Sequence, residues 1–208
     1  MSGRVRLAVL VSGNGTNLQA ILDACVRPDY PAEVVVVVSD RPDAFALERA
    51  RRAGVPAHVV DWSAFRNRST FCRQLEAVLE PYRVGLICLA GFLRILDPPF
   101  VAAYRGRILN IHPSLLPAFG GKGMYGERVH RAVLESGVRV TGCTVHFVTE
   151  EVDQGPIILQ AEVPVLPGDT PQTLAARVAQ EEHRIYPEAI RRVTLGEVRW
   201  EDLETRRP

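Results

Sequence analysis

The chain is predicted to fold as an α/β protein: a single-domain, Rossmann-like three-layer fold whose mostly parallel central sheet has an antiparallel or mixed C-terminal edge. Two observations predict this class. Short apolar runs alternate with segments of helical character through the first half of the 208 residues, which is the pattern of β-α-β units. From residue 106 onward, strand patterns follow one another with less helix between them, which favours antiparallel pairing.

The elements of the first half are expected to alternate along the chain. Apolar runs predict strands at residues 5–11, 34–39, 57–60, 85–89 and 108–111. Helices are predicted at residues 17–24, at 44–53 ending at Gly54, at 70–79 ending before Pro81, and at 98–104 with Asp97 as the N-cap and Pro98 in the first turn. Runs that are apolar at every position leave no solvent side, so helices are expected on both faces of the sheet.

The second half is expected to carry fewer helices. It begins with a Gly/Pro-rich loop at 117–126 and continues with a short helix at 127–135 and strands at 140–148 and 157–165. A final helix is capped at Thr170, and Pro187 is expected to interrupt it before it resumes to residue 193. We expect one domain, 1–208, in which residues 1–105 form a nucleotide- or phosphate-binding half and residues 106–208 a reaction half.

Composition excludes several classes of partner. The chain is 47% hydrophobic and 24% charged, with a formal net charge of +1 and no long Lys/Arg block, so neither nucleic acid nor an anionic membrane surface is indicated. The first apolar run ends at Ser12 and Gly13, is too short to span a membrane and lacks a cleavage site, so a cytoplasmic protein is expected. A homodimer is compatible with the sequence.

The four cysteines are widely separated and form no C-x-x-C pair, so neither a zinc site nor a disulfide framework is signalled. They are interpreted as reduced thiols of the core. Cys143 lies in an apolar run near the predicted site and could serve as a nucleophile. A buried strand cysteine is the favoured interpretation, because free cysteine is usually a core residue.

A glycine-containing turn follows the first strand at residues 12–19, SGNGTNLQ. Such a turn presents backbone N–H groups and the positive end of a helix to an anion. It is not a P-loop, because no Lys-Ser/Thr follows, and Leu18 stands where a dinucleotide fingerprint needs its third Gly. A single phosphate therefore fits better than a pyrophosphate. The alternative is a tight structural turn in which Gly supplies a positive φ and Thr16 or Asn17 only caps the helix.

Three polar residues predict a reaction site. Asn110 and His112 alternate at the end of a strand that Pro113 stops, so both side chains point to the same side. An amide N–H and an imidazolium aimed at one point could stabilise an oxyanion, and Asp153 could hold the imidazole charged and oriented. Each residue alone could instead be a cap, a core histidine or a turn residue. Together they indicate acyl transfer.

Other interpretations use neighbouring residues. His112, His146 and Asp153 could bind a metal for hydrolysis, although their spacing matches no standard zinc pattern. Arg94 could clamp a carboxylate or a planar heterocycle, or lie on a loop in solvent. Glu182 could bind a ligand amine or hydroxyls, or be an ordinary charged position on a helix. A non-catalytic nucleotide-binding module would explain the glycine turn but not the polar triad, and Asp40 as the ribose ligand of a dinucleotide enzyme is weaker still.

The sequence also resembles a known family, the phosphoribosylglycinamide formyltransferases (GAR transformylases), which are folate-dependent enzymes of purine synthesis. The similarity runs from about residue 7 to residue 187. It is carried, in the family's order, by SGNGTNLQA at 12–20, AGFLRIL at 90–96, NIHPSLLP at 110–117, VHFVTEEVDQGP at 145–156 and EHRIYP at 182–187.

The resemblance implies transfer of a formyl group from the co-substrate 10-formyltetrahydrofolate to the amine of glycinamide ribonucleotide, without a metal. It makes residues 106–208 the folate-binding and reaction half. Two features depart from the family pattern: Thr144 stands where other members carry Ser, and the segment 120–126 is longer than in short relatives. The resemblance implies these roles: catalysis by Asn110, His112 and Asp153; nucleotide phosphate binding by Gly15, Thr16 and Asn17; ribose or amine binding by Glu182; and folate binding by Arg68, Leu93, Arg94, Ile95, Leu96 and Val101.

Two related activities use the same three polar residues. A formyl-folate deformylase would use water in place of the amine and resembles a protein with an added N-terminal regulatory domain. A methionyl-tRNA formyltransferase needs a basic C-terminal domain. We expect neither, because 208 residues leave room for neither addition.

Overall fold

The computed structural model describes residues 3–204 and contains one seven-stranded sheet in the order β3-β2-β1-β4-β5-β6-β7. Strands β1 to β5 pair in parallel, whereas β6 pairs antiparallel with both β5 and β7. The predicted fold class, a mostly parallel sheet with an antiparallel C-terminal edge, is confirmed. The strands are β1 (Val5–Val11), β2 (Ala32–Ser39), β3 (Ala57–Val59), β4 (Leu86–Leu89), β5 (Ile108–His112), β6 (Val140–Phe147) and β7 (Ile157–Pro164).

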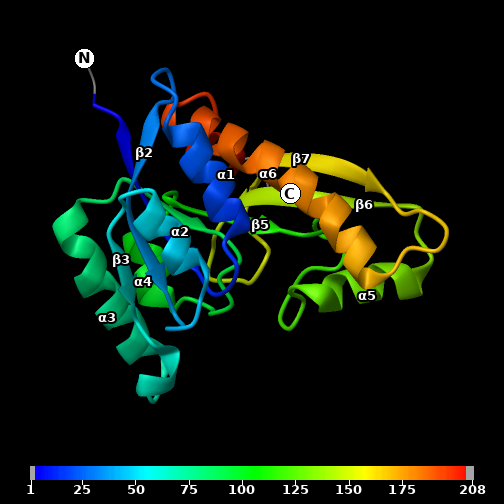
Figure 1. The fold of residues 1–208 in the computed structure, drawn as a ribbon, viewed down its shortest axis with the longest axis horizontal. Helices are drawn as coiled ribbons and strands as arrows, with labels where there is room; N and C mark the ends of the chain where they lie inside the picture. Colours follow the sequence, from blue (N-terminus) through cyan, green and yellow to red (C-terminus); the bar gives the residue numbers. More distant parts are fainter. Residues whose placement is uncertain (1–2, 205–208) are drawn as a thin grey trace.

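Helices cover both faces of the sheet and make the three layers visible in Figure 1. One face packs against α1, α2, α5 and α6, and the other against α3 and α4. β1 shows why both faces need cover: Leu7 and Val9 enter one core cluster, whereas Ala8 and Leu10 enter the other. The helices are α1 (Thr16–Cys25), α2 (Ala46–Arg52), α3 (Arg68–Leu79), α4 (Pro98–Ala103), α5 (Glu127–Ser136), α6 (Pro171–Thr194) and α7 (Trp200–Glu204).

Several local signals read from the sequence are confirmed. Asp97 caps α4 by accepting from the N–H of Phe100 at 3.0 Å, and Thr170 forms a capping box with Thr173 at the start of α6. The helix α7 and the short 3-10 helices at Trp62–Ala64 and Glu80–Tyr82 were not predicted. Of residues 3–204, no helix combines the length and apolar character needed to cross a membrane.

The expected interruption at Pro187 is wrong, because α6 continues through it. Proline removes one N–H from the helix ladder. The helix persists because Ile185, Tyr186 and Ile190 around the proline are fully buried against the sheet, so packing outweighs the local preference. The main-chain oxygen of Pro187 also accepts a hydrogen bond from Tyr30 Oη at 2.7 Å.

The strand order fixes where a ligand can bind. β1 has β2 on one side and β4 on the other, and the helices that follow β1 and β4, α1 and α4, pack on opposite faces of the sheet. In such sheets, the crevice outside the carboxyl ends of the strands at this switch point is the usual ligand site. The segments that follow β1 and β4, which begin at Ser12 and Ala90, meet there, and the N–H of Leu93 donates to Ser12 Oγ at 2.9 Å.

Candidate active site

A cavity of about 640 Å³ opens at this switch point. It brings together the predicted triad of Asn110, His112 and Asp153 with further residues from strand ends, loops and the long helix α6. Three predicted site residues do not line it: Gly15 and Thr16 lie at the start of α1, and Arg68 lies at the start of α3. The predicted residues that do line it are Asn17, Leu93, Arg94, Ile95, Leu96, Val101, Asn110, His112, Asp153 and Glu182.

Asn110 is hydrogen-bonded to His146, a contact that was not predicted from the sequence. It lies opposite His146 in the β5–β6 register, and its Nδ2 lies 3.1 Å from His146 Nε2. His146 Nδ1 lies 2.8 Å from the main-chain oxygen of Phe147 and must therefore carry the proton. Burial lowers the pKa of His146, so the ring is neutral and its Nε2 accepts from the Asn110 amide.

Replacing His146 with Phe tests this arrangement. The acceptor that orients the Asn110 amide would be lost while the bulk of the ring remains, so we expect kcat to fall about tenfold, which is the effect of losing one hydrogen bond of about 1.4 kcal/mol. The Michaelis constants should stay near the normal values. Steady-state kinetics on a variant with a normal circular dichroism spectrum would check it, and an unchanged kcat would contradict it.

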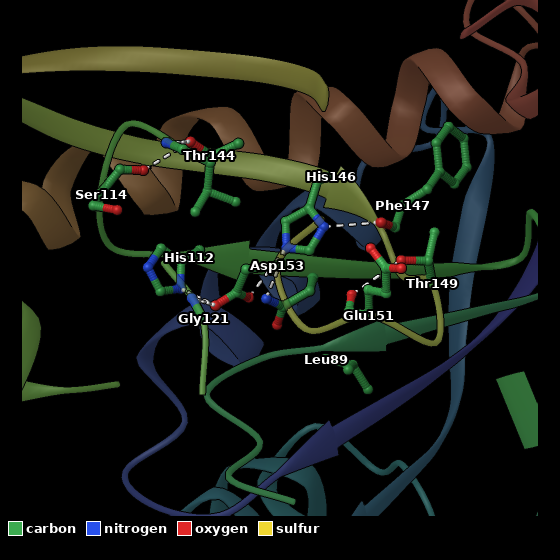
Figure 2. Close-up of polar contacts among 12 residues, drawn as sticks. Leu89, His112, Ser114, Gly121, Thr144, His146, Phe147, Thr149, Glu151 and Asp153 are labelled. Atoms are coloured by element: carbon green, nitrogen blue, oxygen red, sulfur yellow. Dashed lines mark hydrogen bonds and ion pairs between the residues drawn. The ribbon is translucent and has the colours of Figure 1, made fainter. Parts of the chain in front are cut away.

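His112 and Asp153 lie together, as Figure 2 shows. His112 Nδ1 is 3.5 Å from Asp153 Oδ2, and His112 Nε2 donates to the main-chain oxygen of Phe119 at 2.9 Å. Asp153 Oδ2 also accepts from the N–H of Gly121 at 2.9 Å. The loop 117–126 therefore contacts both the imidazole and the carboxylate.

The main chain of Asp153, which positions its carboxylate, adopts an unusual conformation. Its φ of 57° lies in the left-handed region, which costs a non-glycine residue about 1 kcal/mol or more and is commonest at functional sites. The same carboxylate approaches the second histidine, with Oδ1 3.7 Å from His146 Nε2. Asp153 thus lies between the imidazoles of His112 and His146, and Asn110 contacts the second of them.

Thr144 fixes the turn that follows His112. Its hydroxyl donates to the main-chain oxygen of Ser114 at 2.7 Å and accepts from the N–H of Leu116 at 3.0 Å. Gln160 Nε2 also donates to it, at 2.9 Å. The hydroxyl of Thr144 therefore holds both ends of this turn. This structural role of Thr144 was not predicted from the sequence.

The glycine turn is shaped by backbone conformation rather than by a side-chain cap. Gly15 is the N-cap of α1 with a φ of 79°, and no side chain caps the helix, so the suggested cap by Thr16 or Asn17 is wrong. A Cβ on Gly15 would lie 2.6 Å from the Cβ of Ala46 in α2, which leaves room only for glycine. Asn17 Nδ2 instead donates to Glu182 Oε2 at 3.0 Å and links α1 to α6.

Arg94 lines the cavity, but its guanidinium is already engaged. It forms an ion pair with Asp40, whose side chain is fully buried, and it lies 5.1 Å from the centre of the Trp62 ring. Neither of the two roles weighed for Arg94, ligand clamp or solvent-exposed loop residue, describes this contact. The pair also occupies the carboxylate of Asp40 that a dinucleotide ribose would need.

Two alternatives for the chemistry find no support in the geometry. Cys143 is fully buried, and burial raises the pKa of its thiol to about 12, so it is a core residue and not a thiolate nucleophile. For the metal arrangement, His146 has no free lone pair, because Asn110 donates to its Nε2. Among the described residues, no group of three or more His, Cys, Asp or Glu side chains is arranged to hold a metal ion.

An amide, an imidazole and a carboxylate around one cavity of a doubly wound sheet define a group-transfer enzyme of the α/β class. The chain belongs to the formyl transferase family, whose model matches residues 5–190. Over 183 residues it is 49% identical to the phosphoribosylglycinamide formyltransferase of Escherichia coli (strain K12), covering 88% of this chain and 84% of that protein.

Two further relatives show the extent of the similarity. The glycinamide ribonucleotide transformylase 1 of Symbiobacterium toebii has a solved structure that superposes with a TM-score of 0.89 at 56% identity, covering 94% of this chain and 90% of that one. The trifunctional purine biosynthetic protein adenosine-3 of Gallus gallus is 51% identical over 95% of this chain. The chain spans only 19% of the length of that trifunctional relative.

Proposed function

We propose that the protein transfers a formyl group from 10-formyltetrahydrofolate to the amine of N1-(5-phospho-D-ribosyl)glycinamide, giving the N2-formyl product and tetrahydrofolate in de novo purine biosynthesis. The observation that carries the proposal is the convergence of Asn110, His112 and Asp153 on one cavity. The proposal is further supported by relatives that bear the name phosphoribosylglycinamide formyltransferase and match nearly the whole chain.

The three residues divide the chemistry. The neutral amine attacks the formyl carbon, forming a C–N bond while the carbonyl oxygen becomes an oxyanion. Asn110 donates one amide N–H to that oxygen and His112 donates its Nε2–H, which exchanges the main-chain oxygen of Phe119 for the stronger, charged acceptor. Asp153 stabilises the imidazolium from the Nδ1 side and relays the amine proton through a water to the folate nitrogen, which leaves carrying that proton as its bond to the formyl carbon breaks.

The substrates are assigned to different parts of the site; of the three residues assigned to the phosphate, Asn17 lines the cavity. The nucleotide phosphate binds at Gly15, Thr16 and Asn17, and Glu182 binds the ribose or the amine. The folate lies along residues 93–96 and Val101, and its glutamate tail extends beyond the cavity toward Arg68 at the start of α3. The cytoplasmic location, the homodimer and the absence of a metal stay predictions.

A formyl-transfer assay tests the proposal directly. Purified protein is incubated with glycinamide ribonucleotide and 10-formyltetrahydrofolate, and the formylated nucleotide is quantified against a reaction without nucleotide. We expect product only when both substrates are present. Release of formate at an equal rate without the nucleotide would instead identify a deformylase, and no turnover in either reaction would refute the proposal.

Glu182→Gln is expected to weaken substrate binding and to stabilise the fold at neutral pH. Burial raises the pKa of Glu182, so the folded state binds the proton more tightly than the unfolded state and the carboxylate form carries a cost above that pKa. Gln removes the charge and can still accept from Asn17. The loss of a charge-assisted hydrogen bond should raise the KM for the nucleotide at least about tenfold.

The pH dependence separates the two effects of this substitution. The melting temperature of Glu182→Gln should exceed that of the unaltered protein at pH 7.5, and the difference should shrink as the pH falls through the raised pKa and the wild-type carboxyl takes up its proton. Thermal unfolding monitored at several pH values measures this. A difference that grows toward acid pH would show that burial of the charge is not the cause.

A further inference from the structure

Arg49, in the middle of α2, reaches the turn between β1 and α1. It donates from Nε to the main-chain oxygen of Asn14 at 2.8 Å and from Nη2 to Asn14 Oδ1 at 2.7 Å. Its Nη1 donates to Gln19 Oε1 in α1 at 3.3 Å, and the guanidinium lies 5.1 Å from the centre of the Phe45 ring. One side chain therefore binds the turn and the helix that follows it.

The backbone of α2 holds the same turn. The N–H of Ala46 donates to the main-chain oxygen of Gly13 at 3.1 Å, so the carbonyls of Gly13 and Asn14 both face α2. In a planar trans peptide the N–H points opposite to the C=O. The N–H groups of Asn14 and Gly15 therefore point away from α2, and within residues 3–204 no backbone oxygen accepts from the N–H groups of residues 14–17.

We propose that Arg49 is a positioning residue of the phosphate-binding turn: by holding both oxygens of Asn14, it fixes the direction of the N–H groups that receive the phosphate. This inference rests on the proposed function, because the phosphate is that of the nucleotide substrate. Two peptides free to rotate would lose conformational entropy each time the phosphate bound, and a turn held in place beforehand does not. The planar guanidinium suits this role, since it matches two oxygens at once.

The charge of Arg49 offers a competing explanation, because any cation near the turn would attract phosphate. Arg52 provides a matched control for it. Arg52 lies one turn further along α2, at 5.7 Å from the same Phe45 ring, and it pairs with Glu48 at 2.8 Å rather than with the turn. Removing Arg52 deletes the same charge from the same helix and leaves Asn14 held.

The experiment compares Arg49→Ala, Arg49→Lys and Arg52→Ala with the unaltered protein. Calorimetry gives the Kd of inorganic phosphate and of glycinamide ribonucleotide, and steady-state kinetics gives kcat and both KM values. For Arg49→Ala we expect the nucleotide KM and both Kd values to rise at least about tenfold, whereas the folate KM changes less than about twofold. For Arg49→Lys these values should lie between those of Arg49→Ala and the unaltered protein, because lysine keeps the charge but cannot bind two oxygens with a planar guanidinium. For Arg52→Ala they should stay within about twofold of the unaltered protein.

The outcomes separate this inference from the proposed function. Unchanged phosphate affinity in a folded Arg49→Ala protein would overturn it, as would an equal loss in Arg52→Ala or equal rises in both KM values. Should Arg49→Ala fail to fold, Arg49→Lys decides by the same measurements. Weaker phosphate binding by the Arg49 variants, in a protein that forms no formylated nucleotide, would refute the proposed function and leave the role of Arg49 standing. An unaltered protein that binds neither probe would overturn the inference.

Discussion

His112→Ala and Asn110→Ala are each expected to lower kcat at least about a hundredfold, because each removes one of the two donors assigned to the developing oxyanion. Losing such a donor typically costs about 3–4 kcal/mol of barrier. In His112→Ala, the carboxylate of Asp153 also loses the imidazole that lies 3.5 Å from it. The measurement is kcat at saturating concentrations of both substrates, with binding of each substrate checked separately.

His58→Ala is the matched control for the histidine variant. His58 lies in β3 and bonds through Nε2 to Tyr82 Oη at 2.7 Å, outside the set of residues that line the cavity. Its loss should leave kcat within about twofold of normal. If His112→Ala or Asn110→Ala turned over at a near-normal rate with its fold and substrate binding intact, the assignment of these donors would be wrong.

Much of the fold was predictable because the strands are apolar at consecutive positions. Residues 5–11 were predicted as a strand with the observed bounds. The start of α4 was predictable from Asp97, because a carboxylate at the N-cap accepts from an N–H that the helix leaves unpaired. The failure at Pro187 has the opposite origin. Proline does remove a hydrogen bond from the helix, but burial of the neighbouring side chains keeps α6 continuous through Pro187.

The site was predictable in part. The alternation of Asn110 and His112 required only the two-residue period of a strand, and the motif order supplied Asp153. The pairing of Asn110 with His146 depends on the β5–β6 register, and a shift of one residue would place His146 on the other face. The contacts of Arg49 with Asn14 and of Arg94 with Asp40 link residues 35 and 54 positions apart, and no spacing rule connects such pairs.

Gly155 lies where the polar network of the active site meets the backbone of β6. The N–H of Phe147 donates to the main-chain oxygen of Pro156 at 2.9 Å, which draws the chain at Gly155 against Phe147. A Cβ on Gly155 would overlap the main-chain oxygen of Phe147 and would lie 3.3 Å from His146 Nδ1. That oxygen is the acceptor that keeps the proton on His146 Nδ1, so the glycine is required by the site as well as by the strand.

Gly155→Ala is therefore expected to damage stability and activity together. The overlap is with backbone, which has no rotamer to change, so we expect a loss of about 3 kcal/mol in the free energy of unfolding, at the upper end of the usual cost of overpacking. For a chain of this length, this corresponds to a fall of about 6–12 °C in Tm. Gly3→Ala, which has open space around its Cβ, is the control and should leave Tm unchanged.

Activity should fall as well. If the chain at Gly155 moves away from Phe147 to admit the methyl group, His146 loses its acceptor, and kcat of the folded fraction should fall as in His146→Phe. A Gly155→Ala protein with normal Tm would show that the backbone at this point is free to move, and the orientation of the Asn110 amide would then need another cause.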